Sequence, residues 1–298
     1  MNILVVGGAG FIGSEIAKQC VDRGFSVTTM DLKQSKVPGT ESIIKDTTDS
    51  DIPNLDLSKY NIIIMLAAVT NQVEFQKDAV KAFSTNVIGL LNVLEAARKS
   101  NVRKVAFASS SAVYGNINEI ANEDLPIYPD KANMYSTSKI MGEHLFNNYI
   151  KNGFFDGVAM RYFNTYGVGE NDKGDYKSIV SIFLEEIKKK GTATVYGDGE
   201  QKRDMIYVKD TARISIELAL NHSGTFNVGT GESTSWNTIL DILEKNGLKF
   251  ERKYIKNPIN DYQKFTQADT AKLSKLGLKT NITIEEGVKE LIDYYSSS

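Results

Sequence analysis

A glycine-rich turn between a strand and a helix is the feature that most constrains the fold of this chain. The residues before it, Ile3 to Val6, form an unbroken apolar run, which is typical of a strand buried on both faces of a parallel sheet. Gly7, Gly10 and Gly13 follow at once, and residues 14–21 carry apolar side chains at helical spacing. Because this unit lets backbone amides and a helix N-terminus approach a pyrophosphate, it predicts a dinucleotide-binding turn.

An acidic residue ends the next strand. Residues 25–30 are predicted to form that strand, and Asp31 follows it. A carboxylate at this point is placed to accept hydrogen bonds from the ribose hydroxyls of a dinucleotide, and it repels a 2'-phosphate. The sequence therefore favours NAD over NADP, although Lys33 and Lys36 nearby weaken that preference.

The same alternation of strand and helix continues downstream. Strands are predicted over residues 61–66, 102–108 and 157–162, with a helix over residues 87–98 between the first two. Strands that alternate with helices indicate βαβ units and a parallel sheet. We therefore expect an α/β protein with a Rossmann-type, doubly wound parallel sheet.

The pattern changes after about residue 164, where glycine-rich loops are followed by predicted helices over residues 178–190 and 211–220. This change indicates a second, smaller domain. The expected NAD-binding Rossmann domain comprises residues 1–163 and about 206–226, and the expected C-terminal α/β substrate domain comprises residues 164–205 and about 227–298.

The composition argues against several classes of protein. With 35 Lys and Arg residues against 37 Asp and Glu, the net charge of -2 argues against a general nucleic-acid-binding surface. One cysteine, Cys20, and two distant histidines, His144 and His222, argue against disulfides and metal sites. No apolar run approaches the roughly 20 residues that span a bilayer, and residues 1–3 lack the basic region of a signal peptide. We expect a cytoplasmic protein with no metal, membrane or nucleic-acid partner.

Three polar side chains suggest proton-transfer chemistry. Ser110 follows the strand over residues 102–108, and therefore lies at the carboxyl end of the sheet, where ligands bind. Tyr135 and Lys139 are four apart on a predicted helix and share one face. An ammonium beside a phenol lowers the phenol pKa from about 10, which makes Tyr135 a usable base for a sugar or alcohol hydroxyl. Alone, such a Tyr–Lys pair is common on surface helices, but behind a dinucleotide turn it indicates catalysis.

With these residues in place, the chain resembles the extended short-chain dehydrogenase/reductases, specifically the NAD-dependent nucleotide-sugar epimerase and dehydratase group that includes UDP-glucose 4-epimerases. The resemblance covers nearly the whole chain. Its motifs are residues 7–14, 66–68, Asn86, 109–115, 135–139, 161–164 and 197–207.

The resemblance implies most of the candidate site residues. The expected catalytic residues are Ser110, Tyr135 and Lys139. The expected cofactor-binding residues are Gly7, Gly10, Phe11, Ile12, Gly13, Asp31, Leu32, Lys33, Asp46, Thr47, Leu66, Ala67, Ala68, Thr70, Asn86, Ser109, Tyr135, Lys139 and Phe163. The expected nucleotide-sugar-binding residues are Ser110, Ser111, Tyr135, Asn164, Lys173, Ser178, Ile179, Val195, Tyr196 and Arg203. Arg203 matches the arginine that holds the diphosphate, and a guanidinium fork suits phosphate oxygens.

Two reactions of this family lack their residues here. The 4,6-dehydratases carry an acidic pair where this chain has Ser111 and Ala112. The epimerase-reductases of 4-keto sugars use a Cys and a His, whereas Cys20 lies on the first predicted helix, away from the site. Epimerisation by transient oxidation at C4 needs only the tyrosine and a regenerated NAD. A UDP-hexose 4-epimerase, for glucose/galactose or their N-acetyl forms, is therefore our leading hypothesis.

Two alternatives stay open. Residues 261–269 are similar to a segment of the ADP-heptose 6-epimerases, and Lys173 falls where those enzymes carry a second active-site lysine opposite the tyrosine. Asp31, by favouring NAD, fits a 4-epimerase better than these NADP-preferring enzymes. The other alternative is a non-catalytic NAD-binding regulator, but such proteins usually lose the tyrosine or the lysine, and both are present.

The resemblance also implies a homodimer. Family members commonly dimerise through two helices that form a four-helix bundle. The predicted apolar helix faces over residues 87–97 and 139–150 permit this arrangement.

Overall fold

The computed structural model describes residues 1–127, 133–170, 177–257 and 263–297. The chain divides into two compact units. Unit 1 comprises Met1–Gly115, Glu123–Tyr162 and Ala212–Phe226, and unit 2 comprises Asn116–Asn122, Phe163–Thr211 and Asn227–Ser298.

The unit boundaries differ from the expected domains in two short segments. Residues 116–122 group with unit 2 because Ala121 bridges to Ala268 and donates its N–H to the carbonyl oxygen of Gln267. Residues 206–211 also group with unit 2, since strand β10 (Met205–Tyr207) pairs with β7 (Asn164–Tyr166). Neither pairing can be read from the sequence alone.

Unit 1 is built on a seven-stranded sheet with the order β11-β6-β5-β4-β1-β2-β3. Its strands are β1 (Asn2–Val6), β2 (Ser26–Asp31), β3 (Thr40–Ile44), β4 (Ile62–Met65), β5 (Lys104–Ser110), β6 (Asp156–Tyr162) and β11 (Gly224–Val228). The first six pair in parallel. The expected doubly wound α/β sheet is confirmed. Strand β3, a half-exposed edge strand of sequence TESII, was not expected.

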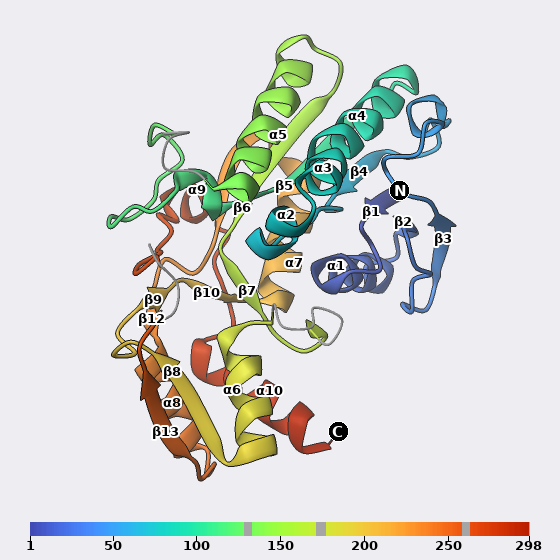
Figure 1. Ribbon diagram of the computed structural model, residues 1–298. Helices are drawn as coiled ribbons and strands as arrows, with labels where there is room; N and C mark the ends of the chain where they lie inside the picture. Colours follow the sequence, from blue (N-terminus) through green and yellow to red (C-terminus); the bar gives the residue numbers. More distant parts are fainter. Residues whose placement is uncertain (128–132, 171–176, 258–262, 298) are drawn as a thin grey trace. The chain divides into compact units, whose positions relative to one another are not determined.

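Helices cover both faces of this sheet (Figure 1). Helices α4 (Gly89–Lys99) and α5 (Met134–Lys151) lie on one face, and α1 (Phe11–Asp22) lies on the other. Two short helices, α2 (Gln72–Lys77) and α3 (Ala79–Phe83), lead into a π-helical turn over Ser84–Ile88. The single helix expected from residue 87 therefore begins within a π turn, a local irregularity that often marks functional sites.

The apolar core of unit 1 explains why these elements stay together. Leu90 and Leu94 of α4 and Phe146 of α5 are buried against Ile63 and Phe107 of the sheet. Full burial of each such side chain contributes about 1.5–3 kcal/mol to folding. The core fixes α5 against β5 and β6, and α5 carries two of the candidate catalytic residues.

Unit 2 consists of small paired strands with helices around them. Its helices are α6 (Ile179–Lys190), α8 (Trp236–Lys245), α9 (Ala271–Lys275) and α10 (Ile284–Ser297), while α7 (Val208–Asn221) begins in unit 2 and belongs to unit 1 from Ala212 onward. Besides β7 and β10, strand β8 (Thr192–Tyr196) pairs with β13 (Glu251–Ile255), and β9 (Lys202–Arg203) pairs with β12 (Thr234–Ser235). Unit 1 also contains two short 3-10 helices, over Ile52–Asn54 and Ser111–Tyr114.

A buried carboxylate holds the loops of unit 2 in place. Asp204 is fully buried and accepts hydrogen bonds from the backbone N–H groups of Thr230 (2.8 Å), Gly231 (3.0 Å) and Ala268 (3.0 Å). Three charge-assisted bonds offset the cost of burying the carboxylate. Asp204 directly follows Arg203, so these loops fix the backbone next to that candidate residue.

Candidate active site

Gly7 and Gly13 must be glycine because a side chain at either position would clash with the backbone, and Gly7 also has a positive φ. Gly7 has φ +84°, and a Cβ there would lie 2.6 Å from the backbone nitrogen of Ala67. A Cβ on Gly13 would lie 2.1 Å from the carbonyl oxygen of Gly7. Gly10 is different, because it is exposed and its Cβ would meet only that same oxygen, at 3.3 Å.

Gly10 leaves room for a ligand instead. It is the N-cap residue of α1, and no side chain caps that helix. A Cβ at Gly10 would stand beside the N-terminus of the helix, where a phosphate group binds most favourably. The turn is thus a cradle that a side chain would fill, and it fits the pyrophosphate of NAD.

Asp31 lies where the ribose-binding carboxylate was expected. It ends β2, and its Oδ2 accepts a hydrogen bond from the N–H of Ala9 in the glycine-rich turn at 3.0 Å. Its Oδ1 is 3.4 Å from the N–H of Lys33. The carboxylate therefore supports the turn as well as standing at its edge, a second role that the sequence did not reveal.

Two further segments border the turn. The N–H groups of Leu66 and Ala67 both donate to the carbonyl oxygen of Val6, at 2.8 and 3.1 Å, which holds the end of β4 beside Gly7. Thr47 is buried next to α4, where a Cβ on Gly89 would lie 2.3 Å from the Thr47 hydroxyl oxygen. The predicted contacts of Asp46, Thr47 and residues 66–70 with the cofactor stay predictions.

The side-chain amide of Asn86 forms three hydrogen bonds within the protein. Its Oδ1 accepts from the N–H of Val69 at 2.7 Å, and its Nδ2 donates to the Val69 carbonyl oxygen and the Ser138 hydroxyl, both at 2.9 Å. Both amide hydrogens are thereby used. Asn86 therefore holds residue 69 against α5. Its side chain has no hydrogen left to donate to the cofactor, for which a direct contact was expected.

The three candidate catalytic residues come together in unit 1. Ser110 is the last residue of β5, and its Oγ accepts the N–H of Ala112 at 3.1 Å. Tyr135 lies in the first turn of α5, and the Ser110 hydroxyl is close enough to its phenol to act on the phenol pKa. One turn further on, Lys139 donates from Nζ to the carbonyl oxygen of Ala108 at 2.8 Å. The catalytic roles of these three residues stay predictions.

The expected effect of Lys139 on Tyr135 is wrong for the protein as it stands. Burial raises the pKa of Tyr135, and only the hydrogen bond with Ser110 acts in the opposite direction. Burial also lowers the pKa of Lys139 to about 8. The lysine points at a backbone carbonyl rather than at the phenol, and its desolvation was not visible in the sequence.

Two side chains of the predicted site are buried, because neighbouring residues of a strand point to opposite faces. Ser109 is buried, and its hydroxyl donates to Glu143, so its side chain faces the interior of unit 1. Val195 of β8 is fully buried, while Tyr196 beside it is exposed. The backbone of Ser109 and Val195 is left to contact a ligand, and their predicted binding roles stay predictions.

The remaining candidate residues described by the structure lie in unit 2. Asn164 is exposed, and its Oδ1 accepts a 3.4 Å hydrogen bond from the hydroxyl of Thr266. Ser178 is the N-cap of α6, ahead of Ile179, and its hydroxyl donates to Glu170 at 2.7 Å. Phe163 is buried. Lys173 and residues 261–262 lie outside the described residues.

Arg203 is more enclosed than a surface phosphate-binding residue. Its guanidinium donates to the carbonyl oxygens of Lys202 (2.9 Å) and Gln263 and lies 5.6 Å from the ring centre of Trp236. These contacts fix the direction of the fork. A role in diphosphate binding stays a prediction.

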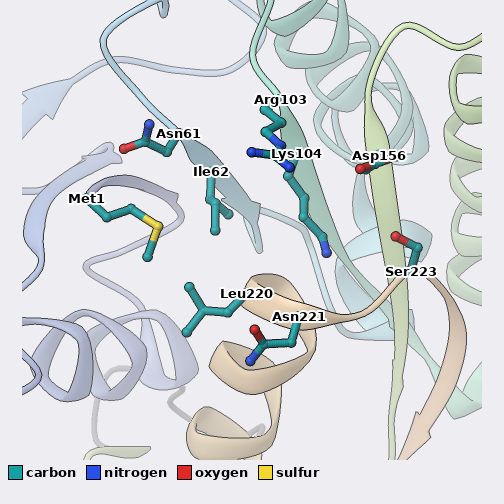
Figure 2. Close-up of a pocket in the computed structure, with 9 residues that line it drawn as sticks. All are labelled: Met1, Asn61, Ile62, Arg103, Lys104, Asp156, Leu220, Asn221 and Ser223. Carbon is teal, nitrogen blue, oxygen red and sulfur yellow. The ribbon is translucent and has the colours of Figure 1, made fainter.

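A separate pocket of about 600 Å³ lies at the opposite end of the strands (Figure 2). Its lining includes Ile62, Lys104 and Asp156, the first residues of β4, β5 and β6, and it contains none of the candidate site residues. In α/β sheets ligands bind at the carboxyl ends of the strands. This pocket is therefore not the candidate active site.

The described residues contain neither a membrane-spanning helix nor a metal-binding cluster. None of the helices there is both long and apolar enough to cross a bilayer. No group of three or more His, Cys, Asp or Glu side chains in the same part of the chain is arranged to hold a metal ion.

Comparison with known proteins agrees with this geometry. The model of the family described as "NAD dependent epimerase/dehydratase family" matches residues 3–229. A putative UDP-glucose 4-epimerase from Methanocaldococcus jannaschii is 32% identical over 99% of both chains. An ADP-L-glycero-D-manno-heptose-6-epimerase from Alkalilimnicola ehrlichii is 29% identical over 98% of this chain and 96% of its own.

A solved structure extends the likeness to the fold. The UDP-glucose 4-epimerase of Thermus thermophilus, in complex with NAD, superposes with a TM-score of 0.89 at 29% identity and covers 100% of both chains. The family match includes the glycine-rich turn and the Ser110–Tyr135–Lys139 grouping. The chain therefore belongs to the NAD dependent epimerase/dehydratase family and is an NAD-dependent enzyme of the epimerase type.

Proposed function

We propose that this protein is a UDP-hexose 4-epimerase that acts by transient oxidation at C4 of the sugar. The observation that carries the proposal is the grouping of Ser110, Tyr135 and Lys139 at the carboxyl end of β5, in the same unit as the glycine-rich turn. The 4-epimerases among its full-length relatives support the reaction class.

The residues around this grouping favour epimerisation over the other family reactions. Ser111 and Ala112, in the 3-10 helix that follows β5, carry no carboxyl group for an elimination. Cys20 is fully buried in α1, and burial raises its pKa to about 12, which argues against a role for it as the acid or base.

In the proposed reaction, Tyr135 takes the proton from the C4 hydroxyl through its phenolic oxygen, and Ser110 shares the hydrogen bond to the same oxygen. Bound NAD, which the glycine-rich turn and Asp31 would hold, would supply reversible hydride transfer at C4. Lys139, one helical turn from Tyr135, supplies positive charge on the same face of α5. Tyr135 returns the proton after the keto sugar has rotated in the site. The hydride and the proton balance over one cycle, so no external oxidant is needed.

The proposed substrate contacts of unit 2 concern the nucleotide part of the substrate. Asn164 and Tyr196 are exposed and able to donate and accept hydrogen bonds, and Arg203 carries the positive charge. The UDP-sugar enzymes among the relatives support a uridine nucleotide, and an N-acetyl form of the sugar remains within the proposal.

The second candidate function is an ADP-heptose 6-epimerase that uses Tyr135 with Lys173. The full-length heptose epimerase relative supports it, while Lys173 lies outside the described residues. The third is a non-catalytic NAD-binding regulator, against which the intact Ser110–Tyr135–Lys139 grouping argues.

A proton NMR time course tests these functions directly. The purified protein, with its co-purifying NAD, is incubated separately with UDP-glucose, UDP-N-acetylglucosamine and an ADP-heptose. The C4 epimer of either UDP-sugar is the expected product. Inversion of only the heptose would establish the second candidate, and bound NAD with no turnover of any sugar would favour the regulator.

A prediction for the cofactor concerns the charge of Asp31. Asp31→Asn keeps an acceptor for the N–H of Ala9 but removes the repulsion of a 2'-phosphate. We expect the ratio of the NADP to the NAD dissociation constant to fall by about tenfold, which corresponds to ~1.4 kcal/mol. Titration calorimetry with both cofactors measures the ratio, and Asp56→Asn, on an exposed loop, is the control. An unchanged ratio would mean that the ribose is recognised elsewhere.

A prediction for the substrate concerns Arg203. Arg203→Ala is expected to weaken UDP binding by about 10- to 100-fold, because a charge-assisted fork to phosphate contributes roughly 1.5–3 kcal/mol. Binding of NAD should change by less than about twofold. Lys202→Ala, at the exposed neighbouring position, is the control. If binding of UDP and NAD is lost equally, the contacts of Arg203 with Lys202 and Gln263 serve the fold instead.

Homodimerisation through α4 and α5 is the last part of the proposal. Ile88 and Met141, just before α4 and within α5, are large apolar side chains that are exposed in the single chain. Analytical ultracentrifugation of the purified protein tests for a dimer.

A further inference from the structure

A buried ion pair lies directly behind the candidate catalytic residues. Glu143 is one helical turn beyond Lys139 on α5, and Arg161 is on β6. The guanidinium donates through Nε to Oε1 of Glu143 at 2.9 Å and through Nη2 to Oε2 at 2.8 Å. Both side chains are only 5–6% exposed.

The pair connects every element that carries a candidate catalytic residue. Glu143 also accepts the hydroxyl of Ser109, the residue before Ser110 on β5. Arg161 donates through Nη1 to the phenol oxygen of Tyr114 at 2.9 Å and to the carbonyl oxygen of Glu123 at 3.2 Å. Tyr114 ends the short 3-10 helix for which Ser110 is the N-cap. One carboxylate thus joins α5, β5 and β6, and its arginine partner extends the network to that 3-10 helix.

Stability alone does not account for this arrangement. Removing two charges from water is costly, and apolar side chains of similar volume commonly replace buried ion pairs without loss of stability. A hydrogen-bonded carboxylate does something that an apolar side chain cannot, because its bonds fix both the distance and the direction between the groups that it joins.

The charge of Glu143 also acts on the site. Lys139 is buried, and Glu143 is the nearby charge that raises its pKa against the effect of burial. Without the carboxylate, Arg161 and Lys139 would remain as two buried cations in the same part of unit 1. Like charges at short range in a poorly solvated region repel strongly.

We propose that Glu143 is a positioning residue for the reaction. Through Ser109 it fixes the carboxyl end of β5, and with it Ser110, relative to Tyr135 and Lys139 on α5. The inference rests on the proposed function, because it assigns to Glu143 an effect on proton and hydride transfer at that site. Glu143 touches neither substrate nor cofactor.

The test compares two carboxylates that make the same kinds of bond. Glu143→Gln keeps the shape of the side chain but removes the charge and one acceptor. Glu95→Gln is the matched control, because Glu95 on α4 also accepts a bidentate arginine, Arg98, and the hydroxyl of a tyrosine, Tyr149, near the far end of α5.

For Glu143→Gln we expect kcat to fall by about 10- to 100-fold, since small misplacements of catalytic groups have effects of this size. The KM for the nucleotide sugar and the dissociation constant of NAD should stay within about twofold of wild type. Glu95→Gln should keep kcat within about twofold. An unchanged kcat in folded Glu143→Gln, or equal losses in kcat, KM and NAD binding, would overturn the inference.

A second measurement does not depend on activity. Amide hydrogen exchange followed by mass spectrometry reports local opening. Glu143→Gln is expected to speed exchange in peptides covering residues 106–115, while exchange in β1 and in unit 2 stays as in wild type. Faster exchange throughout unit 1 would indicate a general structural role and contradict the inference.

Two further comparisons distinguish failure of this inference from failure of the fold or of the proposed function. Should Glu143→Gln fail to fold, Ser109→Ala removes only the link to β5 and is expected to lower kcat by about 3- to 10-fold, with faster exchange over residues 106–115. An unchanged kcat and unchanged exchange in that variant would overturn the inference. If the wild type converts no nucleotide sugar, the proposed function fails, and the exchange experiment alone then decides whether Glu143 fixes the end of β5.

Discussion

Replacement of Tyr135 by phenylalanine is expected to lower kcat by about 10³-fold or more while the fold and NAD binding are retained. The substitution removes only the phenolic oxygen, which is the proposed proton acceptor, and general acid–base catalysis contributes about 10²- to 10⁴-fold. The edge-to-face contact of the ring with Phe75, at 6.1 Å, is kept. Ser110 loses one partner but keeps the N–H of Ala112.

The measurement is the rate of epimer formation by proton NMR, together with the absorbance of reduced nicotinamide after substrate is added. In Tyr135→Phe both signals should be lost. Tyr149→Phe is the matched control, because it is the same substitution on the same helix, about four turns beyond Tyr135. Retention of more than about a tenth of the wild-type kcat by Tyr135→Phe would remove this residue as the base.

The parts of the fold that could be predicted are those set by local sequence. Apolar runs and glycine spacing predicted β1, the turn and α1, because a buried parallel strand and a phosphate-binding turn each impose their own residue types. Strand β3 was missed, since an edge strand such as TESII needs no continuous apolar run. The grouping of residues 116–122 with unit 2 could not be predicted, because their partner, Ala268, is far away in the sequence.

The candidate site, too, could be predicted only where it depends on local sequence. Ser110, Tyr135 and Lys139 were identified from a strand end and one helical turn, which are local relations. Whether Ser109 or Ser110 faces the site depends on the register of β5, because neighbouring strand residues point to opposite faces. The pairing of Glu143 with Arg161 requires that α5 packs against β6 in one register, and no spacing in the sequence reveals that register.

Replacement of Lys139 by methionine is expected to separate stability from activity. Methionine has a similar length and no charge, so the variant should lose turnover by about 10²-fold or more, since Lys139 is the proposed source of positive charge on the Tyr135 face of α5. It should also escape the cost of burying an ammonium group. Against this, the carbonyl oxygen of Ala108 loses its donor, at a cost of about 1–3 kcal/mol.

The pH dependence of stability distinguishes these effects. Burial lowers the pKa of Lys139 from 10.5 to about 8, so between these values the unfolded chain binds the proton more tightly than the folded one. The free energy of unfolding of the wild type should therefore rise with pH across this window, relative to Lys139→Met, by up to about 1.4 kcal/mol per pH unit. Below the folded pKa both states carry the proton, and the difference between the two proteins should be constant.

Urea unfolding of the NAD-free proteins at a series of pH values measures this difference. Comparison with Lys139→Met cancels the other groups that titrate in the same range, provided that they titrate alike in both proteins. Lys45→Met, at an exposed lysine paired with Asp51, is the control, and it should show no rise with pH, because a partner that raises a lysine pKa gives stability that is lost at high pH. A flat difference for Lys139→Met would mean that Lys139 is as well solvated in the folded protein as in the unfolded chain.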